Sequence, residues 1–162
     1  MFSDYWLKNI ETPAFIYDEV EIERLLDLGN RVREQSSCKV LFSLKPFSFY
    51  DALAKMAPRL DGFAVSSLFE ARLASQIIGS GSVHITTPGI RPDETADIGT
   101  ICNFISFNSL PQWDLYHEEL KVHLSCGLRV NPQLSFVDDQ RYDPCRPHSK
   151  LGVPLADLVT VA

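Results

Sequence analysis

The chain has 162 residues, 45% of them hydrophobic and 22% charged, which is an ordinary composition for a globular domain with a hydrophobic core. No apolar run approaches the roughly 18 residues of a membrane span, and residues 1–10 lack the basic start and apolar core of a signal peptide. The formal charge is −6 and the 15 basic residues are scattered, which argues against nucleic-acid binding. We therefore expect a cytoplasmic protein with neither a membrane nor a nucleic acid as partner.

The cysteines and histidines are widely spaced and contain no C-x-x-C pair or other metal-ligand pattern. We expect reduced thiols and no bound metal. The residues concerned are Cys38, Cys102, Cys126 and Cys145, and His84, His117, His123 and His148.

Short β-like runs alternate with helical patterns along the chain, which indicates parallel strands joined by helical crossovers. Strands are expected over residues 14–17, 40–45, 62–67, 83–87, 104–108 and 122–130. Helices are expected over 19–34, 49–57, 68–78, 92–98 and 111–119, the first with Asp18 as its cap and with Ile22, Leu25, Leu26 and Val32 as its apolar stripe. Residues 131–150 contain three prolines and no periodicity, so they are predicted to form a long loop.

The faces of the strands distinguish two α/β architectures. Residues 40–45 and 122–130 each have an apolar side and a mixed side, and the mixed sides carry Lys45 and Arg129. A barrel takes the mixed side inward and covers the apolar side with helices, whereas a doubly wound sheet has central strands that are apolar throughout. The pattern favours a barrel and leaves the doubly wound sheet as the alternative.

A complete (β/α)8 TIM barrel takes ~250 residues, so this chain is expected to hold about five of the eight βα units. Residues 1–162 would then be the N-terminal portion of such a barrel, with no second domain. Open strand edges at both ends predict marginal stability or self-association.

Lys45 ends a predicted strand on its mixed face, at the end of a barrel where catalytic groups gather. A lysine in a partly desolvated pocket has a lowered pKa, and its neutral amine can attack a carbonyl. The alternative is a strand-end lysine that simply reaches water. Arg129 could orient a cofactor ring, pair with a phosphate or fill an internal salt bridge.

Two serines precede helical patterns in the arrangement of a helix cap. Ser67 and Glu70 form an S-x-x-E capping box, and Ser109 with Gln112 can cap the later helix in the same way. A structural role is sufficient for both pairs, and a site role for Ser67 is the alternative.

Several of these stretches resemble the fold-type III enzymes that use pyridoxal 5′-phosphate (PLP), the alanine-racemase-like barrels. They are TPAFIYD at residues 12–18 and FSLKPFS at 42–48. Further stretches resemble, within that group, the carboxynorspermidine (carboxyspermidine) decarboxylases: LDGFAVSSLFEARL at 60–73, FNSL at 107–110, GLRVNP at 127–132, YDPCRP at 142–147 and SKLG at 149–152. The resemblance runs from about residue 12 to residue 153 and keeps the family's order.

The resemblance implies that Lys45 is the catalytic lysine that binds PLP, with Arg129 and Ser67 as further cofactor-binding residues. Lys150 stands where the family more often has arginine, which is not an equivalent residue. The implied reaction removes the α-carboxylate of carboxynorspermidine or carboxyspermidine and gives norspermidine or spermidine in polyamine biosynthesis. The PLP ring accepts the electrons left when CO₂ departs.

The resemblance also implies that much of the family's site lies outside this sequence. The missing parts are a histidine stacked on PLP, a glycine-rich phosphate loop, the acid at the pyridine nitrogen, the acids that hold the polyamine, and a C-terminal β-domain that completes the site in a homodimer. The isolated chain is therefore expected to be inactive. A non-catalytic PLP-binding remnant, a PLP carrier, a diaminopimelate-type decarboxylase and an amino-acid racemase are the alternatives.

Overall fold

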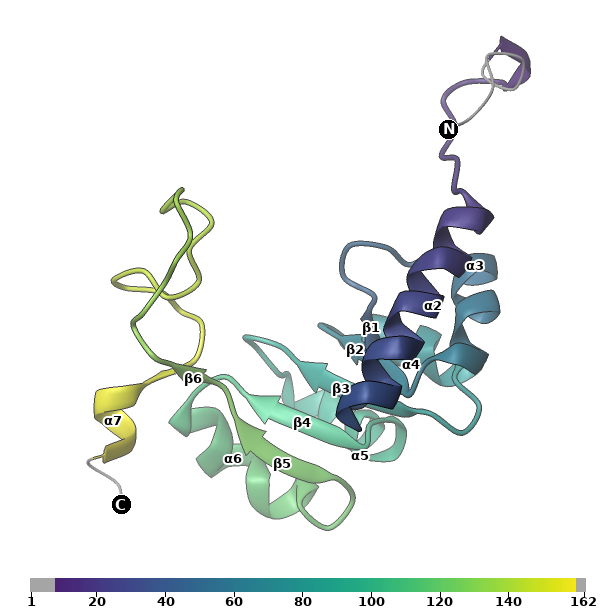
Figure 1. Cartoon of the computed structure of the whole chain (residues 1–162). Coiled ribbons are helices and arrows are strands. Elements are labelled where there is room, and N and C mark those ends of the chain that lie inside the picture. Colours follow the sequence, from purple (N-terminus) through teal and green to yellow (C-terminus); the bar gives the residue numbers. More distant parts are fainter. Residues whose placement is uncertain (1–7, 160–162) are drawn as a thin grey trace.

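The computed structural model describes residues 8–159, which form a curved sheet flanked by helices (Figure 1). Most of the segment considered above as a signal peptide, residues 1–7, lies outside the described residues. Among the described residues, no helix has the length and the apolar character to cross a membrane.

Five parallel strands form the main sheet in the order β1-β2-β3-β4-β5. Their bounds are Leu41–Ser43, Gly62–Val65, Ser82–Thr86, Phe104–Phe107 and Ser125–Leu128. Each strand lies beside its neighbour in the chain, whereas a doubly wound sheet reverses its order at a switch point. The predicted α/β class is confirmed, and the strand order is that of part of a TIM-barrel wall.

The five predicted helices begin at or within one residue of the expected position, the fourth of them as a 3-10 turn. Their bounds are α2 Glu19–Ser36, α3 Tyr50–Met56 with the 3-10 turn η1 Ala57–Arg59, α4 Leu68–Ile77, η2 Pro92–Glu94 with α5 Thr95–Ile101, and α6 Leu110–Leu120. A further short helix, α7 Leu155–Val159, was not predicted. All three expected caps form: Asp18 accepts from the first turn of α2, Ser67 from that of α4, and Ser109 from that of α6. These side chains satisfy N–H groups that have no partner within the helix.

The two faces of the sheet differ as the strand patterns predict. Side chains facing the helices form the core, and Phe63, Ile85 and Phe107 are almost fully buried there. The open face carries a row in register across all five strands, made of Ser43, Ala64, His84, Phe104 and Ser125. Small and polar side chains, together with the ring of Phe104, therefore line the face that a barrel turns inward.

The prediction of a strand at residues 14–17 is wrong. The main sheet ends at β1, so these residues have no strand beside them with which to form a ladder. Phe15 and Ile16 are exposed instead. The predicted stripe of α2 is also only half buried: Leu26 and Ile22 face the core, whereas Leu25 and Val32 remain exposed because α2 lies at the open β1 end of the sheet.

The predicted long strand at residues 122–130 is divided. At its start the chain is still turning out of α6, since His123 N and Leu124 N both donate to Leu120 O at 2.9 and 3.0 Å. At its end the partner strand changes at Arg129. Its N–H donates to Phe107 O of β4, while its carbonyl accepts from Val153 N. The chain continues as β6 (Val130–Asn131), which pairs with β7 (Val153–Pro154).

The surface of the chain is large for its mass. Its accessible area is 11154 Å², against about 8,100 Å² expected from the scaling law for a folded monomer of 18.3 kDa. The open sheet face, the apolar side chains of α2 and the loop of residues 132–152 contribute to the difference. The predicted self-association is consistent with this surplus and stays a prediction.

Candidate active site

The carboxyl ends of the five parallel strands lie along one edge of the sheet, which we call the carboxyl edge. Lys45 follows β1 by two residues, Ser67 follows β2 by two, and Arg129 directly follows β5. The structure therefore places all three predicted site residues at this edge. Lys45 and Arg129 are far apart, because β1 and β5 are separated by four strand spacings, roughly 19 Å along the sheet. Ser67 lies one strand from Lys45, and within the described residues its hydroxyl bonds to neither of the other two.

Lys45 occupies the tip of a turn that is anchored on both sides. Leu44 is buried, and its N–H donates to Ala64 O of β2 at 3.0 Å. Phe47 N then donates back to Leu44 O at 3.0 Å and closes the turn. The Lys45 side chain is exposed, and within residues 8–159 its ammonium makes no hydrogen bond or ion pair. The partly desolvated pocket expected for this lysine is thus not supplied by the described residues alone.

Lys45 lies in the wall of an open cavity of about 650 Å³. Its lining is mostly aromatic and apolar, and consists of Phe15, Ile16, Tyr17, Lys45, Pro46, Phe47, Ser48 and Phe49. The rings of Tyr17 and Phe49 lie 5.3 Å apart at 54°. Lys45 is the one charged residue of this lining. The cavity therefore offers a primary amine among flat apolar surfaces, and its lining contains no second cation that would pair with a phosphate.

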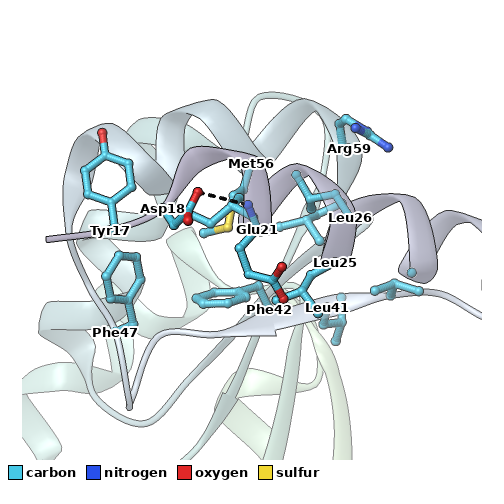
Figure 2. A pocket seen from close by; sticks show the side chains of 14 residues that line it. Tyr17, Asp18, Glu21, Leu25, Leu26, Leu41, Phe42, Phe47, Met56 and Arg59 are labelled. Carbon is cyan, nitrogen blue, oxygen red and sulfur yellow. Dashed lines mark hydrogen bonds between the residues drawn. The ribbon is translucent and has the colours of Figure 1, made fainter. Parts of the chain in front are cut away.

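A second cavity, of about 390 Å³, lies beneath α2 (Figure 2). Tyr17 and Phe47 line both cavities, so the two are adjacent. The three charged groups of this second cavity already have partners: Asp18 caps α2, Glu21 pairs with Arg24, and Arg59 pairs with Glu23 and Asp27. It offers apolar burial and lacks a free reactive group.

Ser67 makes the contacts of a helix cap. Its hydroxyl oxygen accepts from Glu70 N at 3.2 Å, as the capping box predicts. The Glu70 carboxylate reaches back one residue further than expected, to Ser66, whose N–H donates at 2.7 Å and whose hydroxyl donates at 2.9 Å. In the described structure the Ser67 hydroxyl donates to no other group, so a cofactor role for it remains a prediction.

Arg129 is half-buried at the opposite end of the carboxyl edge. Its backbone joins β4 and β7, and within the described residues its guanidinium forms no ion pair or hydrogen bond. The internal salt bridge considered for Arg129 is thus not formed in this part of the chain. Its role at a cofactor stays a prediction.

Asn108 was not identified as a site residue from the sequence. It is buried at the end of β4, where its Nδ2 donates to Lys150 O at 2.7 Å and its Oδ1 accepts from Gly152 N at 3.0 Å. The available signal was an asparagine that directly follows an apolar strand and directly precedes a capping serine. A polar side chain at the inner end of a buried strand needs partners, and those partners are distant in sequence.

His84 lies on the open face, stacked on Phe104 with ring centroids 4.2 Å apart. Ser82 Oγ lies 2.8 Å from His84 Nε2, in hydrogen-bond contact, and 3.3 Å from Asp61 O. Burial, and after it the charge of Lys39, lowers the pKa of His84. A neutral imidazole is thereby favoured in this position.

Comparison with known proteins relates nearly the whole chain to decarboxylases. It is 36% identical over 153 residues to the carboxyaminopropylagmatine decarboxylase of Synechocystis sp., a match that covers 94% of this chain and 39% of that protein. It is 32% identical over 154 residues to the carboxynorspermidine/carboxyspermidine decarboxylase of Campylobacter jejuni, covering 95% and 40%. A protein with the same description from Herminiimonas arsenicoxydans is 34% identical over 143 residues, covering 88% and 39%.

A solved structure agrees with these sequences. The crystal structure of carboxynorspermidine decarboxylase from Campylobacter jejuni, complexed with norspermidine, superposes with a TM-score of 0.81 at 31% identity. The match covers 94% of this chain and 38% of that one. The chain thus spans about two fifths of the length of the relatives it matches. No protein-family model matches it.

Proposed function

We propose that this chain, homologous over 94% of its length to polyamine-type decarboxylases, carries the lysine that binds PLP in an enzyme of that kind, and that this lysine is Lys45. One observation carries the proposal. Lys45 projects from the carboxyl end of β1 as the one charged group of an aromatic cavity. A primary amine at that end of a parallel strand is where a barrel enzyme holds a carbonyl-reactive group.

The residues around Lys45 fit part of PLP. The amine of Lys45 would hold the cofactor, and the rings of Tyr17, Phe47 and Phe49 would flank its flat pyridine ring. When bound, PLP supplies a sink for the electrons left on carbon after CO₂ departs. Ser67, whose hydroxyl proton is free to be donated to a phosphate oxygen, and Arg129, a fixed cation, are the proposed further cofactor-binding residues at the same edge.

The names of the relatives define the proposed substrate class. They act on carboxynorspermidine, carboxyspermidine or carboxyaminopropylagmatine, all of them carboxylated polyamine-like molecules, and one relative was crystallised with norspermidine. We propose that a longer parent of this chain decarboxylates a substrate of this class as a cytoplasmic homodimer. The barrel would be of the alanine-racemase-like type, with about five of its eight βα units in this chain and with the C-terminal β-domain outside it.

The isolated chain is proposed to lack decarboxylase activity. Lys45 is exposed, so the described residues do not desolvate the amine, and the lining of its cavity includes no second cation to pair with a phosphate. Catalysis requires such groups to be held in place before the reaction begins. The exposure of Lys45 also favours the second candidate function, a remnant that binds PLP and catalyses no reaction.

Borohydride trapping of PLP tests the proposal directly. The chain is incubated with PLP, reduced, digested, and each modified lysine is located by mass spectrometry. We expect one label per chain, at Lys45, and none in K45R, which keeps the charge and removes the amine. Lys55 and Lys121, both exposed and both paired with a carboxylate, are internal controls for surface labelling.

Labelling spread evenly over the surface lysines, with K45R labelled as much as the parent, would contradict a preformed site at Lys45. Release of CO₂ from carboxynorspermidine, measured on the same sample, separates the two candidate functions. Selective labelling without turnover supports the remnant for this chain. Selective labelling with turnover supports the enzyme and refutes the proposal that the isolated chain is inactive.

A further inference from the structure

We propose that Asn108 is a positioning residue, which fixes the loop of residues 132–152 to the carboxyl edge of the sheet beside Arg129. The significance of this position for catalysis rests on the proposed function. The attachment itself is a property of this chain.

The amide of Asn108 is divided between two backbone groups of the same loop. Nδ2 donates to Lys150 O at 2.7 Å, and Oδ1 accepts from Gly152 N at 3.0 Å. Only 6% of Asn108 is exposed, so water does not replace these partners. A carboxamide satisfies both groups because it carries one donor and one acceptor side by side.

Asn108 is also the centre of a chain of hydrogen bonds along the carboxyl edge. Its backbone N–H donates to Gln112 Oε1 at 2.8 Å, and Gln112 Nε2 donates to Pro88 O at 2.9 Å, in the loop after β3. On the other side, Val153, the residue after Gly152, donates its N–H to Arg129 O at 2.7 Å. Asn108, at the end of β4, is thus linked to the loop after β3 through Gln112. It is linked to the end of β5 through the base of the loop of residues 132–152.

The rest of the loop has few other attachments to the sheet. Figure 1 shows it extending away from the strands, and its hydrogen bonds are mainly internal: Cys145 N donates to Asp143 Oδ1 at 2.8 Å, and Ser149 Oγ to Pro144 O at 2.6 Å. These internal bonds give the loop a shape but do not place it. The bonds to Asn108 and the short β6–β7 pair place it.

The geometry at Gly152 shows that the attachment is close. Gly152 has φ +83°, and a Cβ at this position would lie 3.0 Å from Asn131 N and 3.1 Å from Arg129 O. The loop backbone therefore lies directly against β6. A loss of the Asn108 bonds would release Lys150 and loosen the contact at Arg129 together.

Three variants test the role by amide hydrogen exchange, followed residue by residue by NMR and expressed as protection factors. N108L has a similar volume and makes neither bond. N108D at pH 8 carries an ionised carboxyl that accepts from Gly152 N but cannot donate to Lys150 O. Burial raises the pKa of the new carboxyl, so lowering the pH to 5 favours the protonated form, which can both accept and donate. N103D is the control for an aspartate placed elsewhere on β4: Asn103 is exposed, precedes β4 at the opposite edge, and within the described residues its side chain accepts from Val83 N at 2.8 Å and donates to none.

We expect N108L to lower the protection of the Gly152 and Val153 amides by about tenfold, the effect of losing a buried hydrogen bond, with little change in β2 and β3. At pH 8, N108D should lower the protection of Val153 by a similar factor, because the loop loses its donor at Lys150 O, but it should protect Gly152 better than N108L does, because the carboxylate still accepts from that amide. At pH 5 the protection of Val153 should return to within about threefold of the parent. N103D should leave the protection factors of the loop amides unchanged at both pH 8 and pH 5. If Asn108 only filled space, the protection factors of N108D would not recover when the pH is lowered from 8 to 5.

Unchanged protection of Gly152 in N108L would overturn the proposal, and so would N108D without recovery between pH 8 and pH 5. A loss spread equally over β2, β3 and the loop would show a general loss of stability and would also overturn it. If N108L does not fold, the two pH values of N108D carry the test within one chain. No cofactor is present in these measurements, so failure here is distinct from failure of PLP to label Lys45.

Discussion

Replacing Ser67 with alanine separates its observed role as a helix cap from its predicted role at the cofactor. The hydroxyl oxygen accepts from Glu70 N at 3.2 Å, and alanine leaves that N–H without its partner. The loss of such a cap costs about 1 kcal/mol. For a chain of this size that is a fall of roughly 2–4 °C in Tm. S67D keeps an acceptor at the cap and adds a charge that the helix dipole favours, so its stability should stay within about 0.5 kcal/mol of the parent.

The assay compares urea unfolding with borohydride trapping of PLP at Lys45. S109A is the matched control, because Ser109 caps α6 in the same way, with Gln112 N at 3.3 Å, and lies at the end of another strand. If Ser67 binds the phosphate, S67A lowers trapping more than S109A at equal stability, and S67D lowers it further because its charge repels the phosphate. Equal trapping in S67A and S109A would show that Ser67 is a cap and nothing more.

Four further outcomes follow from the structure. G152A should lose about 1–3 kcal/mol in urea unfolding, because its φ of +83° suits glycine and its new Cβ would lie 3.1 Å from Arg129 O; an unchanged midpoint would contradict the close approach. F63A removes a ring with no exposure and should cost about 3–5 kcal/mol, a large part of the 5–15 kcal/mol typical of a domain, so loss of the cooperative transition by circular dichroism is expected. Burial raises the pKa of the Cys102 thiol from 9.0 to about 12, so a thiol reagent at pH 8 should modify exposed Cys38 and leave Cys102 unreacted. The same shift means that the stability due to the neutral Cys102 thiol is complete below pH 9 and is lost as the pH rises toward 12, which urea midpoints at pH 7 and pH 10 measure.

The helices were predictable because their signals are local. Asp18, Ser67 and Ser109 each accept from an N–H two or three residues later, so the sequence contains both partners of the cap within one turn. For the strands, the sequence predicted the apolar central residues but not the residues at which each strand begins and ends. Residues 122–124 have the alternation of a strand, yet they complete a turn onto Leu120, because the end of α6 offers them a nearer hydrogen-bond acceptor.

The position of Lys45 was predictable from the sequence, but its surroundings were not. The sequence places Lys45 at the end of a strand, and the structure keeps it there, at the tip of the turn that closes on Leu44. The surroundings of Lys45 were not predictable from its neighbours in the sequence. Phe15 and Tyr17 reach its cavity from a segment about thirty residues earlier in the chain, which had been expected to form a strand.

By itself, the sequence determined the alternation of strands and helices, the helix starts, the lysine at a strand end and the resemblance to PLP-dependent decarboxylases. These depend on neighbours within about four residues, or on short motifs that keep their order. The tertiary structure alone decided where β5 exchanges one partner strand for another at Arg129, and what Asn108 binds. The partners of Asn108 lie 42 and 44 residues away, and hydrogen bonds over such separations depend on the assembled sheet, not on local preference.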